Sequence, residues 1–289
     1  MQYISNCGFV KHPEFNISGG AHCCKLFQKN DHECLKEPYT TDIVISINIY
    51  RNPQFLNEQL KNISQYVKST YAVILNCNDL MLAELMETRL APNVFINPEP
   101  INKKRFHGSL TKGIVSNMQY ALNNFTFRYF VVLSARTVFY RDLCTSNLDE
   151  LNKYLPDGIS KKSDYSLEQI KSDRVAKMDL VGWQWPSLKN SLLVKYYLNK
   201  GFKLHKGAHE GLCFSKDVVN NIIKFLTDNN KIKEELFILE SVVEEFALQS
   251  IAMNEISEGD YAYLYIGNGC YNAVNMELKD RYVKKIPFS

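Results

Sequence analysis

The chain has 289 residues, 45% of them hydrophobic and 22% charged, so it is long enough to bury one large core or two small ones. With 34 basic and 31 acidic residues, its formal net charge of +3 is too small to indicate binding to nucleic acid or to an anionic membrane. No apolar run reaches the roughly 18 residues of a membrane span, and Met1 starts no basic-then-apolar segment. We therefore expect a cytoplasmic protein that is neither membrane-spanning nor secreted.

Residues 1–41 lack sustained periodicity, and we expect them to form an arm packed on the main domain. The arm contains a group of cysteines and histidines, namely Cys7, His12, His22, Cys23, Cys24, His32 and Cys34. Zinc could use four of these side chains, but no C-x-x-C pair occurs and the spacings match no familiar zinc motif. We therefore favour an irregular surface arm over a metal site. The other four cysteines lie singly in or beside apolar segments and are expected to be free thiols.

A regular alternation of strands and helices starts at Asp42. Apolar, β-branched runs predict strands at 43–49, 71–76, 93–97 and 129–134, and helical spacing predicts helices at 55–67, 80–87 and from Ser109 or Thr111 onward. This order indicates an α/β fold in which helices flank an open, mostly parallel sheet, within one domain spanning 42–289. Ligands of such sheets bind beyond the carboxyl ends of the strands, so the loops after those strands are expected on one rim.

The second half of the chain is less regular. Residues 156–177 are polar and predict a surface loop, and residues 212–226 predict a short strand followed by an amphipathic helix. Residues 236–255 predict one further helix, with Glu244 and Glu245 on opposite flanks of its apolar stripe. Only one of these carboxylates would then face a pocket, where desolvation suits a general base. The alternative is a solvated helix face.

Several familiar motifs are absent, including G-x-G-x-x-G, the P-loop, G-x-S-x-G and H-E-x-x-H. His107, Gly108 and Ser109 stand at a predicted helix start, where backbone N–H groups attract anions or sugar oxygens, although an ordinary cap is the alternative. The strand ending at Ser134 runs into Ala135-Arg136-Thr137. At this junction many sugar-transferring enzymes of α/β fold carry Asp-x-Asp, which holds a metal ion on a nucleotide diphosphate. Here another group must neutralise such a ligand.

Residues 107–151 resemble the central block of the core-2/I-branching glycosyltransferases and the related peptide-O-xylosyltransferases. Residues 43–79 resemble the opening block of that family, Phe214-Ser215-Lys216-Asp217 its apolar-Ser-Arg-Glu element, and Glu244-Glu245-Phe246 its Asp-Glu-aromatic element. The resemblance covers most of 42–289 without near identity in any segment. Within the family, the small chlorovirus xylosyltransferases that build capsid glycans are the most similar.

The resemblance implies a GT-A fold, an inverting reaction and no metal ion. It places Glu245 at the catalytic base and Glu244 at the preceding acidic position, on the acceptor side. In that family the basic side chains that bind the diphosphate lie near the carboxyl end. The candidates in this chain are Arg281, Lys284 and Lys285, and we favour Arg281 and Lys285 over Lys284. Two fixed cations can replace a metal ion on a diphosphate. A solvated basic tail is the alternative.

Other side chains complete the predicted site. Trp183 and Trp185 share a face if their segment is extended, and they would either stack on an acceptor sugar or lie in the core. Glu210, next to His209, is the rival catalytic base. Asp79 would contact uracil or ribose, or cap a turn. Ser134 and Arg136 are expected to line the nucleotide-sugar site.

The predicted function is transfer of a sugar, xylose ahead of N-acetylglucosamine, from a UDP-sugar to a hydroxyl of a glycan acceptor. No cofactor, metal ion or nucleic acid is expected to take part, and a viral protein of this kind would act in the host cytoplasm. Three alternatives stay open: a metal-dependent transferase of the same fold, a non-catalytic glycan-binding module, and a zinc-binding interaction protein built around the amino-terminal arm.

Overall fold

The computed structural model describes residues 37–49, 55–87, 90–154, 186–202, 204–205, 208–255, 264–268 and 282–285. The amino-terminal group of cysteines and histidines lies outside the described residues, and so do the predicted loop at 156–177, Trp183, Trp185 and Arg281. Their predicted roles therefore stay predictions.

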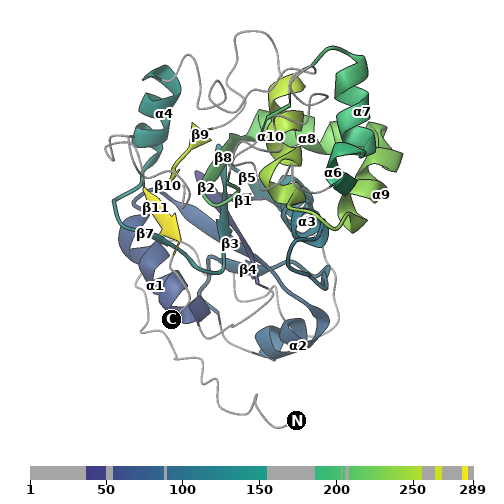
Figure 1. Ribbon diagram of the computed structural model, residues 1–289. Helices are drawn as coiled ribbons and strands as arrows, with labels where there is room; N and C mark the ends of the chain where they lie inside the picture. Colours follow the sequence, from purple (N-terminus) through teal and green to yellow (C-terminus); the bar gives the residue numbers. More distant parts are fainter. Residues whose placement is uncertain are drawn as a thin grey trace.

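A six-stranded sheet forms the centre of the molecule, in the order β4-β3-β2-β6-β8-β9 (Figure 1). Its strands are β2 (Ile43–Asn48), β3 (Tyr71–Asn76), β4 (Val94–Ile96), β6 (Tyr129–Ser134), β8 (Leu212–Ser215) and β9 (Leu264–Tyr265). The first four are parallel to one another, whereas β8 is antiparallel to β6 and to β9. The predicted α/β fold with a mostly parallel sheet is confirmed.

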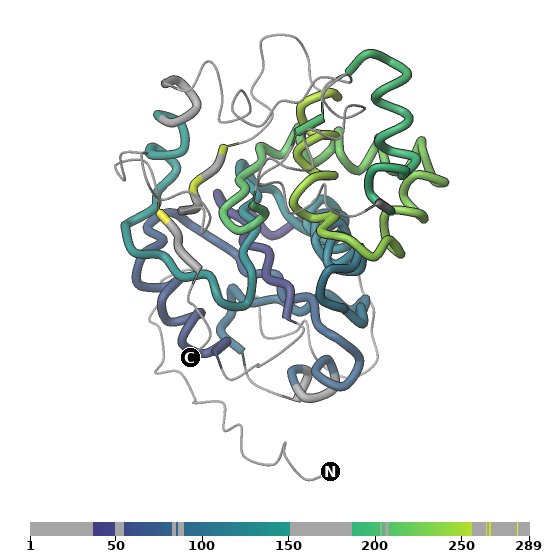
Figure 2. The backbone as a smooth tube through the Cα atoms, viewed as in Figure 1, coloured from purple at the N-terminus to yellow at the C-terminus, as the bar shows by residue number. Residues whose placement is uncertain are grey.

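Helices cover both faces of the sheet, and this explains why its parallel strands are almost entirely apolar. The helices α3 (Ser109–Asn124), α8 (Lys216–Asp228) and α10 (Ala247–Asn254) pack on one face, against residues such as Val44 and Val132. The helices α1 (Leu56–Tyr66) and α4 (Thr145–Tyr154) pack on the other, against Ile45 and Ile47. Figure 2 shows the green carboxyl-terminal helices on the same side as α3, with α1 opposite. Each fully buried aliphatic side chain contributes about 1.5–3 kcal/mol.

Smaller elements surround this centre. Within the described ranges, the remaining α-helices are α2 (Asp79–Glu87), α6 (Pro186–Lys189), α7 (Leu192–Asn199) and α9 (Asn230–Ile238). Strand β1 (Tyr39–Thr40), which belongs to the predicted arm, pairs with β5 (Phe125–Thr126). A three-stranded sheet joins β10 (Gly267–Asn268), β11 (Val283–Lys285) and β7 (Thr137–Phe139), in that order. Of the helices that the structure describes, none has both the length and the apolar character needed to cross a bilayer.

The prediction of one helix over 236–255 is wrong. Helix α9 ends at Ile238, Leu239 is extended with φ −60° and ψ 134°, and a single 3-10 turn, η6 (Val243–Glu245), precedes α10. Ser241 and the β-branched Val242 and Val243 occupy the interruption, and these residue types lose more than most in a helix. Glu244 and Glu245 therefore belong to a tight turn instead of the two flanks of a helix.

Helix α3 starts in close contact with α9. A Cβ at Gly108 would lie 1.8 Å from the carbonyl oxygen of Leu236, and the Gly108 N–H donates to the Leu239 carbonyl at 2.8 Å. The φ of Gly108 is −56°, an ordinary helical value, so glycine is required here by lack of space and not by backbone conformation. Gly108 thus fixes how close α9 comes to the start of α3.

Replacement of Gly108 by alanine is expected to lower the free energy of unfolding by about 3 kcal/mol, since neither backbone can move aside cheaply. Urea denaturation of the purified variant measures this loss. Gly201→Ala is the matched control: it meets no atom within 4 Å but has φ 71°, so it should lose only about 1 kcal/mol. Equal stability of the two variants would contradict the packing argument.

Candidate functional site

Polar side chains end all four parallel strands of the central sheet at the same edge. Asn48 pairs in register with both Asn76 and Ser134, and Asn97 follows β4 directly, donating its N–H to the Leu75 carbonyl at 2.9 Å. The first strand of this set, β2, has β3 and β4 on one side and β6 on the other. The strand order therefore reverses at β2, and open α/β sheets bind ligands beyond the carboxyl ends at such a reversal.

The turn after β6 is held in one shape by uncharged hydrogen bonds. The N–H of Ser134 donates to Oγ1 of Thr137 at 3.1 Å. The buried Gln59, from α1, donates its Nε2 to the carbonyl oxygens of Ser134 and Thr137, at 2.8 and 2.7 Å. Arg136 belongs to the same turn, between Ser134 and Thr137, and its side chain is partly buried. The shape of this turn thus comes from amide and hydroxyl groups of α1 and of the turn itself.

The basic carboxyl-terminal segment runs beside the same turn. Strand β11 is antiparallel to β7, and its register pairs Lys285 with Thr137 and Lys284 with Val138 (Figure 1). Because Thr137 closes the turn that starts at Ser134, the backbone of β11 brings both predicted lysines to the carboxyl end of β6. Sequence periodicity gave no sign of this pairing, since a three-residue strand is too short to show a pattern.

The rival base Glu210 also lies near the end of β6. It directly precedes Gly211, whose N–H donates to the Val132 carbonyl at 2.8 Å, and it is 8% exposed. Its Oε2 is 3.5 Å from Nδ1 of His209. A buried carboxylate beside an imidazole is a suitable proton acceptor when the imidazole orients it.

The two glutamates of η6 differ in burial. Glu244 is 4% exposed, whereas Glu245 is partly exposed. The chain that leads into η6 passes the start of α3, where Leu239 accepts the hydrogen bond from Gly108. A partly exposed Glu245 can meet a ligand from solvent, and the buried Glu244 is the more constrained of the two.

The start of α3 does not offer its first N–H groups to a ligand. The N–H of Gly108 donates to Leu239, and the N–H of Ser109 donates to Nδ1 of His107 at 3.0 Å. The small size of Gly108 accommodates α9, and its N–H is engaged by Leu239, so this N–H does not attract an anion or sugar oxygen as expected. Burial, together with the charge of Lys104, lowers the pKa of His107. Because Nδ1 accepts a hydrogen bond, the proton of the neutral imidazole is on Nε2.

Asp79 is the first residue of α2, immediately beyond β3, and its side chain is exposed. Its Oδ2 accepts a hydrogen bond from Nδ2 of Asn102 at 3.2 Å, so it joins α2 to the loop after β4. This contact leaves the carboxylate accessible from the carboxyl edge of the sheet, as a contact with ribose or base would require.

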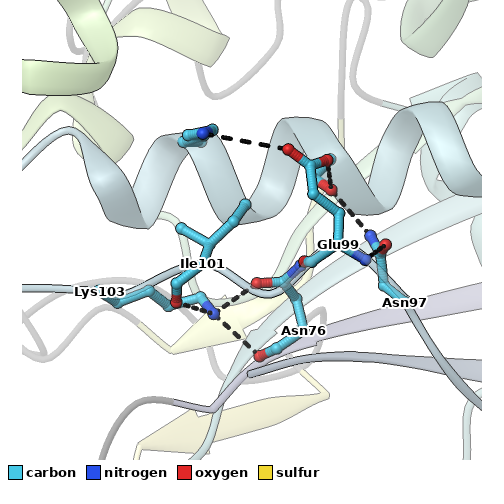
Figure 3. A network of polar contacts seen from close by, with 7 residues as sticks. Asn76, Asn97, Glu99, Ile101 and Lys103 are labelled. Atoms are coloured by element: carbon cyan, nitrogen blue, oxygen red, sulfur yellow. Dashed lines mark hydrogen bonds and ion pairs between the residues drawn. The ribbon is translucent and has the colours of Figure 1, made fainter. Parts of the chain in front are cut away.

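A lysine that sequence analysis missed lies at the same edge (Figure 3). The amine of Lys103 donates to the carbonyl oxygen of Asn76 at 3.0 Å, to Oδ1 of Asn76, and to the carbonyl oxygen of Ile101 at 3.3 Å. Nδ2 of Asn76 donates in turn to the Glu99 carbonyl at 3.0 Å. Lys103 thus fastens the loop after β4 to the end of β3.

A second set of buried amides fastens α3 to the strands. Nδ2 of Asn97 donates to Oδ1 of Asn117 at 3.0 Å and to Oγ of Ser116 at 2.9 Å. Nδ2 of Asn117 donates to Oγ of Ser46, within β2, at 2.9 Å. Buried amides that are satisfied in this way fix relative positions more strictly than apolar contacts do. The asparagines at the ends of β2 and β3 and directly after β4 were a visible signal in the sequence, whereas nothing in the sequence marked Lys103.

Desolvation is the main electrostatic influence on Lys103. Burial of the amine lowers its pKa from an ordinary 10.5 to about 7. Burial also raises the pKa of the neighbouring Cys77 thiol to about 11, so that thiol is protonated and uncharged near neutral pH. The neutral amine is therefore much more accessible near neutral pH than it is for an ordinary lysine, although the surroundings supply oxygens that accept from it.

Neither a scan against protein-family models nor a search of curated proteins found a match to this chain. The resemblance to core-2/I-branching glycosyltransferases therefore stays a prediction. Within the part of the chain that the structure describes, no group of three or more His, Cys, Asp or Glu side chains is arranged as metal ligands.

Replacement of Lys103 by methionine is expected to change how stability depends on pH. Between about pH 7 and 10.5 the folded wild type binds fewer protons at this site than the unfolded chain does, so its stability rises with pH. This contribution is lost in the variant, and the stability difference, wild type minus variant, should rise by up to about 1.4 kcal/mol per pH unit.

Urea denaturation of both proteins from about pH 6 to about pH 9 measures that difference. Lys112→Met is the matched control, because it removes a lysine on α3 whose side chain is 44% exposed. A flat difference for Lys103→Met would show that the amine is not desolvated.

Proposed function

We propose that the protein is an inverting glycosyltransferase that moves a sugar from a UDP-sugar to a hydroxyl of a glycan acceptor, with xylose as the favoured donor sugar. One observation carries this proposal. The antiparallel pairing of β11 with β7 brings the backbone of Lys284 and Lys285 to the turn after β6. That turn is where metal-dependent sugar transferases of α/β fold carry Asp-x-Asp, and Ser134-Ala135-Arg136 stands there in this chain.

In the proposed reaction, charge builds on the leaving diphosphate as its bond to the sugar breaks. Arg281 and Lys285, with Lys284 as the further candidate, neutralise that charge in place of a metal ion. Arginine does so with a bidentate fork and lysine as a point charge. Donors that are already in position when the charge develops lower the barrier by roughly a few kcal/mol each.

A single displacement accounts for inversion. The acceptor oxygen attacks the anomeric carbon, the bond from that carbon to the phosphate oxygen breaks, and UDP leaves. Glu245 takes the proton of the attacking hydroxyl, supported by its partial exposure in η6 next to the buried Glu244. Glu210 is the second candidate for this base, supported by its burial close to the end of β6. Trp183 and Trp185 are proposed to stack on the acceptor sugar.

Replacement of Glu245 by glutamine is expected to lower kcat at least about 100-fold, because an amide cannot accept the proton. Release of UDP in the presence of acceptor glycan measures it. Glu234→Gln, on the exposed side of α9, is the matched control and should retain full activity. If Glu210→Gln abolishes turnover and Glu245→Gln does not, the assignment of the base moves to Glu210.

A panel of UDP- and GDP-sugars, scanned for thermal stabilisation and hydrolysis with EDTA present, tests the class of reaction. The expected result is stabilisation by one UDP-sugar, which raises the unfolding midpoint as its concentration exceeds Kd, and turnover that survives chelation. Loss of turnover in EDTA would indicate the metal-dependent alternative. Glycan binding without turnover of any donor would indicate a binding module, and bound zinc found by elemental analysis would favour the interaction protein.

A further inference from the structure

The loop between β4 and α3 presents a run of basic residues and one aromatic residue at the carboxyl edge of the sheet. Its sequence is Lys103-Lys104-Arg105-Phe106, directly before His107. The side chains of Lys104, Arg105 and Phe106 are exposed, and the side chain of Lys103 is partly buried. This combination of fixed cations with an exposed ring suits a ligand that carries both phosphate and an aromatic base.

Phe106 has a strained backbone. Its φ is 53°, and among the described residues it is the one residue other than glycine with positive φ. A bulky side chain is a true outlier in that region, and residues of this kind persist where the surrounding structure holds them, often at ligand sites. The guanidinium of Arg105 lies 4.4 Å from the centroid of the Phe106 ring. An aromatic ring and a cation therefore lie together at the edge of the sheet, on a backbone conformation that the surrounding structure must hold.

Among the described residues, Lys103 has neutral oxygen atoms as its hydrogen-bond partners and no carboxylate in an ion pair. Its amine donates to oxygens of Asn76 and Ile101, and within the described residues no carboxylate lies within 4.0 Å of it as an ion-pair partner. Asn48, 7% exposed, also faces it: a Cβ on Gly113 would lie 2.5 Å from Oδ1 of Asn48 and 2.7 Å from Cε of Lys103. That Oδ1 accepts no hydrogen bond among the described residues.

The ionisable groups around Lys103 are engaged elsewhere or uncharged. The Cys77 thiol is protonated near neutral pH, because burial raises its pKa to about 11. Asp79, from α2, accepts from Asn102. Glu99, from the same loop, accepts from Ser116 of α3 and lies 4.0 Å from the amine of Lys112. The adjacent Lys104 adds further positive charge.

We propose that residues 103–106 form an anion-binding site for a phosphate-bearing ligand, with Lys103 as its buried cation and Phe106 as the aromatic surface beside it. The anion supplies the counter-charge that the amide oxygens lack, so its binding favours the protonated amine. The proposal that the ligand is a nucleotide rests on the proposed function, whereas the anion site itself does not. Strand β11 and this loop then approach the ligand from opposite sides of β2.

Amine acetylation tests the proposal, because only the neutral amine reacts and protonation or coverage protects it. The protein is labelled at about pH 7, and peptide mass spectrometry reports modification of Lys103 and of the control Lys112, without ligand and with inorganic pyrophosphate, UDP or uridine. Pyrophosphate and UDP are expected to slow modification of Lys103 at least about fivefold, whereas uridine should have little effect. Lys112 should be unaffected by all three.

The outcomes separate this inference from the proposed function. Protection by pyrophosphate but not by UDP or any UDP-sugar supports the anion site and counts against a nucleotide-sugar enzyme. Thermal stabilisation by UDP with no protection of Lys103 overturns the anion site and leaves the enzyme proposal standing. Equal labelling with and without pyrophosphate and UDP also overturns the anion site.

Three variants test the two named residues separately. Lys103→Met should weaken pyrophosphate binding about tenfold, whereas Lys103→Arg, which keeps the charge, should restore most of it. Phe106→Gly should raise the unfolding midpoint, because glycine accepts positive φ, and at the same time weaken UDP binding. A stabilised Phe106→Gly protein with unchanged UDP affinity would overturn the role of the ring.

Discussion

The pairing of β2 with a parallel strand on each side determines where everything else in the candidate site lies. Asn48 is level with both Asn76 and Ser134, so the loops that follow three different strands start from one line. A shift of one residue in either register would move the side chains of β2 to the opposite faces of the sheet and take the polar end groups out of line. Two apolar faces hold this register, since residues on each side of β2 are buried under helices.

Buried amides add precision that apolar packing alone does not give. Asn97 and Asn117 connect the end of β4, helix α3 and Ser46 of β2 through hydrogen bonds of 2.9–3.0 Å. Each such group would be costly if it were left unsatisfied, so the network tolerates few arrangements of α3 on the sheet. The loop that holds Lys103 starts at this network, and Lys103 attaches it a second time, to Asn76 at the end of β3.

Hydrophobic periodicity was sufficient to predict the four parallel strands and the helices between them, because their apolar runs are long and buried on both sides. It failed at 236–255, where apolar spacing continues across a break that Ser241 and two valines impose. Periodicity could not predict β11, because a three-residue strand is too short to show a pattern and is defined by its pairing with β10 and β7. The polar rim was foreseeable from the residues that follow each strand, but Lys103 was not, because its desolvation depends on Asn76 and Gly113 folding against it.

Helix α3 is held at two glycines on different sides, by the α9 backbone at Gly108 and by Asn48 and Lys103 at Gly113. In both places the neighbouring group occupies the space that a Cβ would need, so α3 packs closer to α9 and to the end of β2 than a larger residue would permit. We therefore expect any movement around a ligand to occur in the side chains and loops at the edge of the sheet, while α3 stays in place.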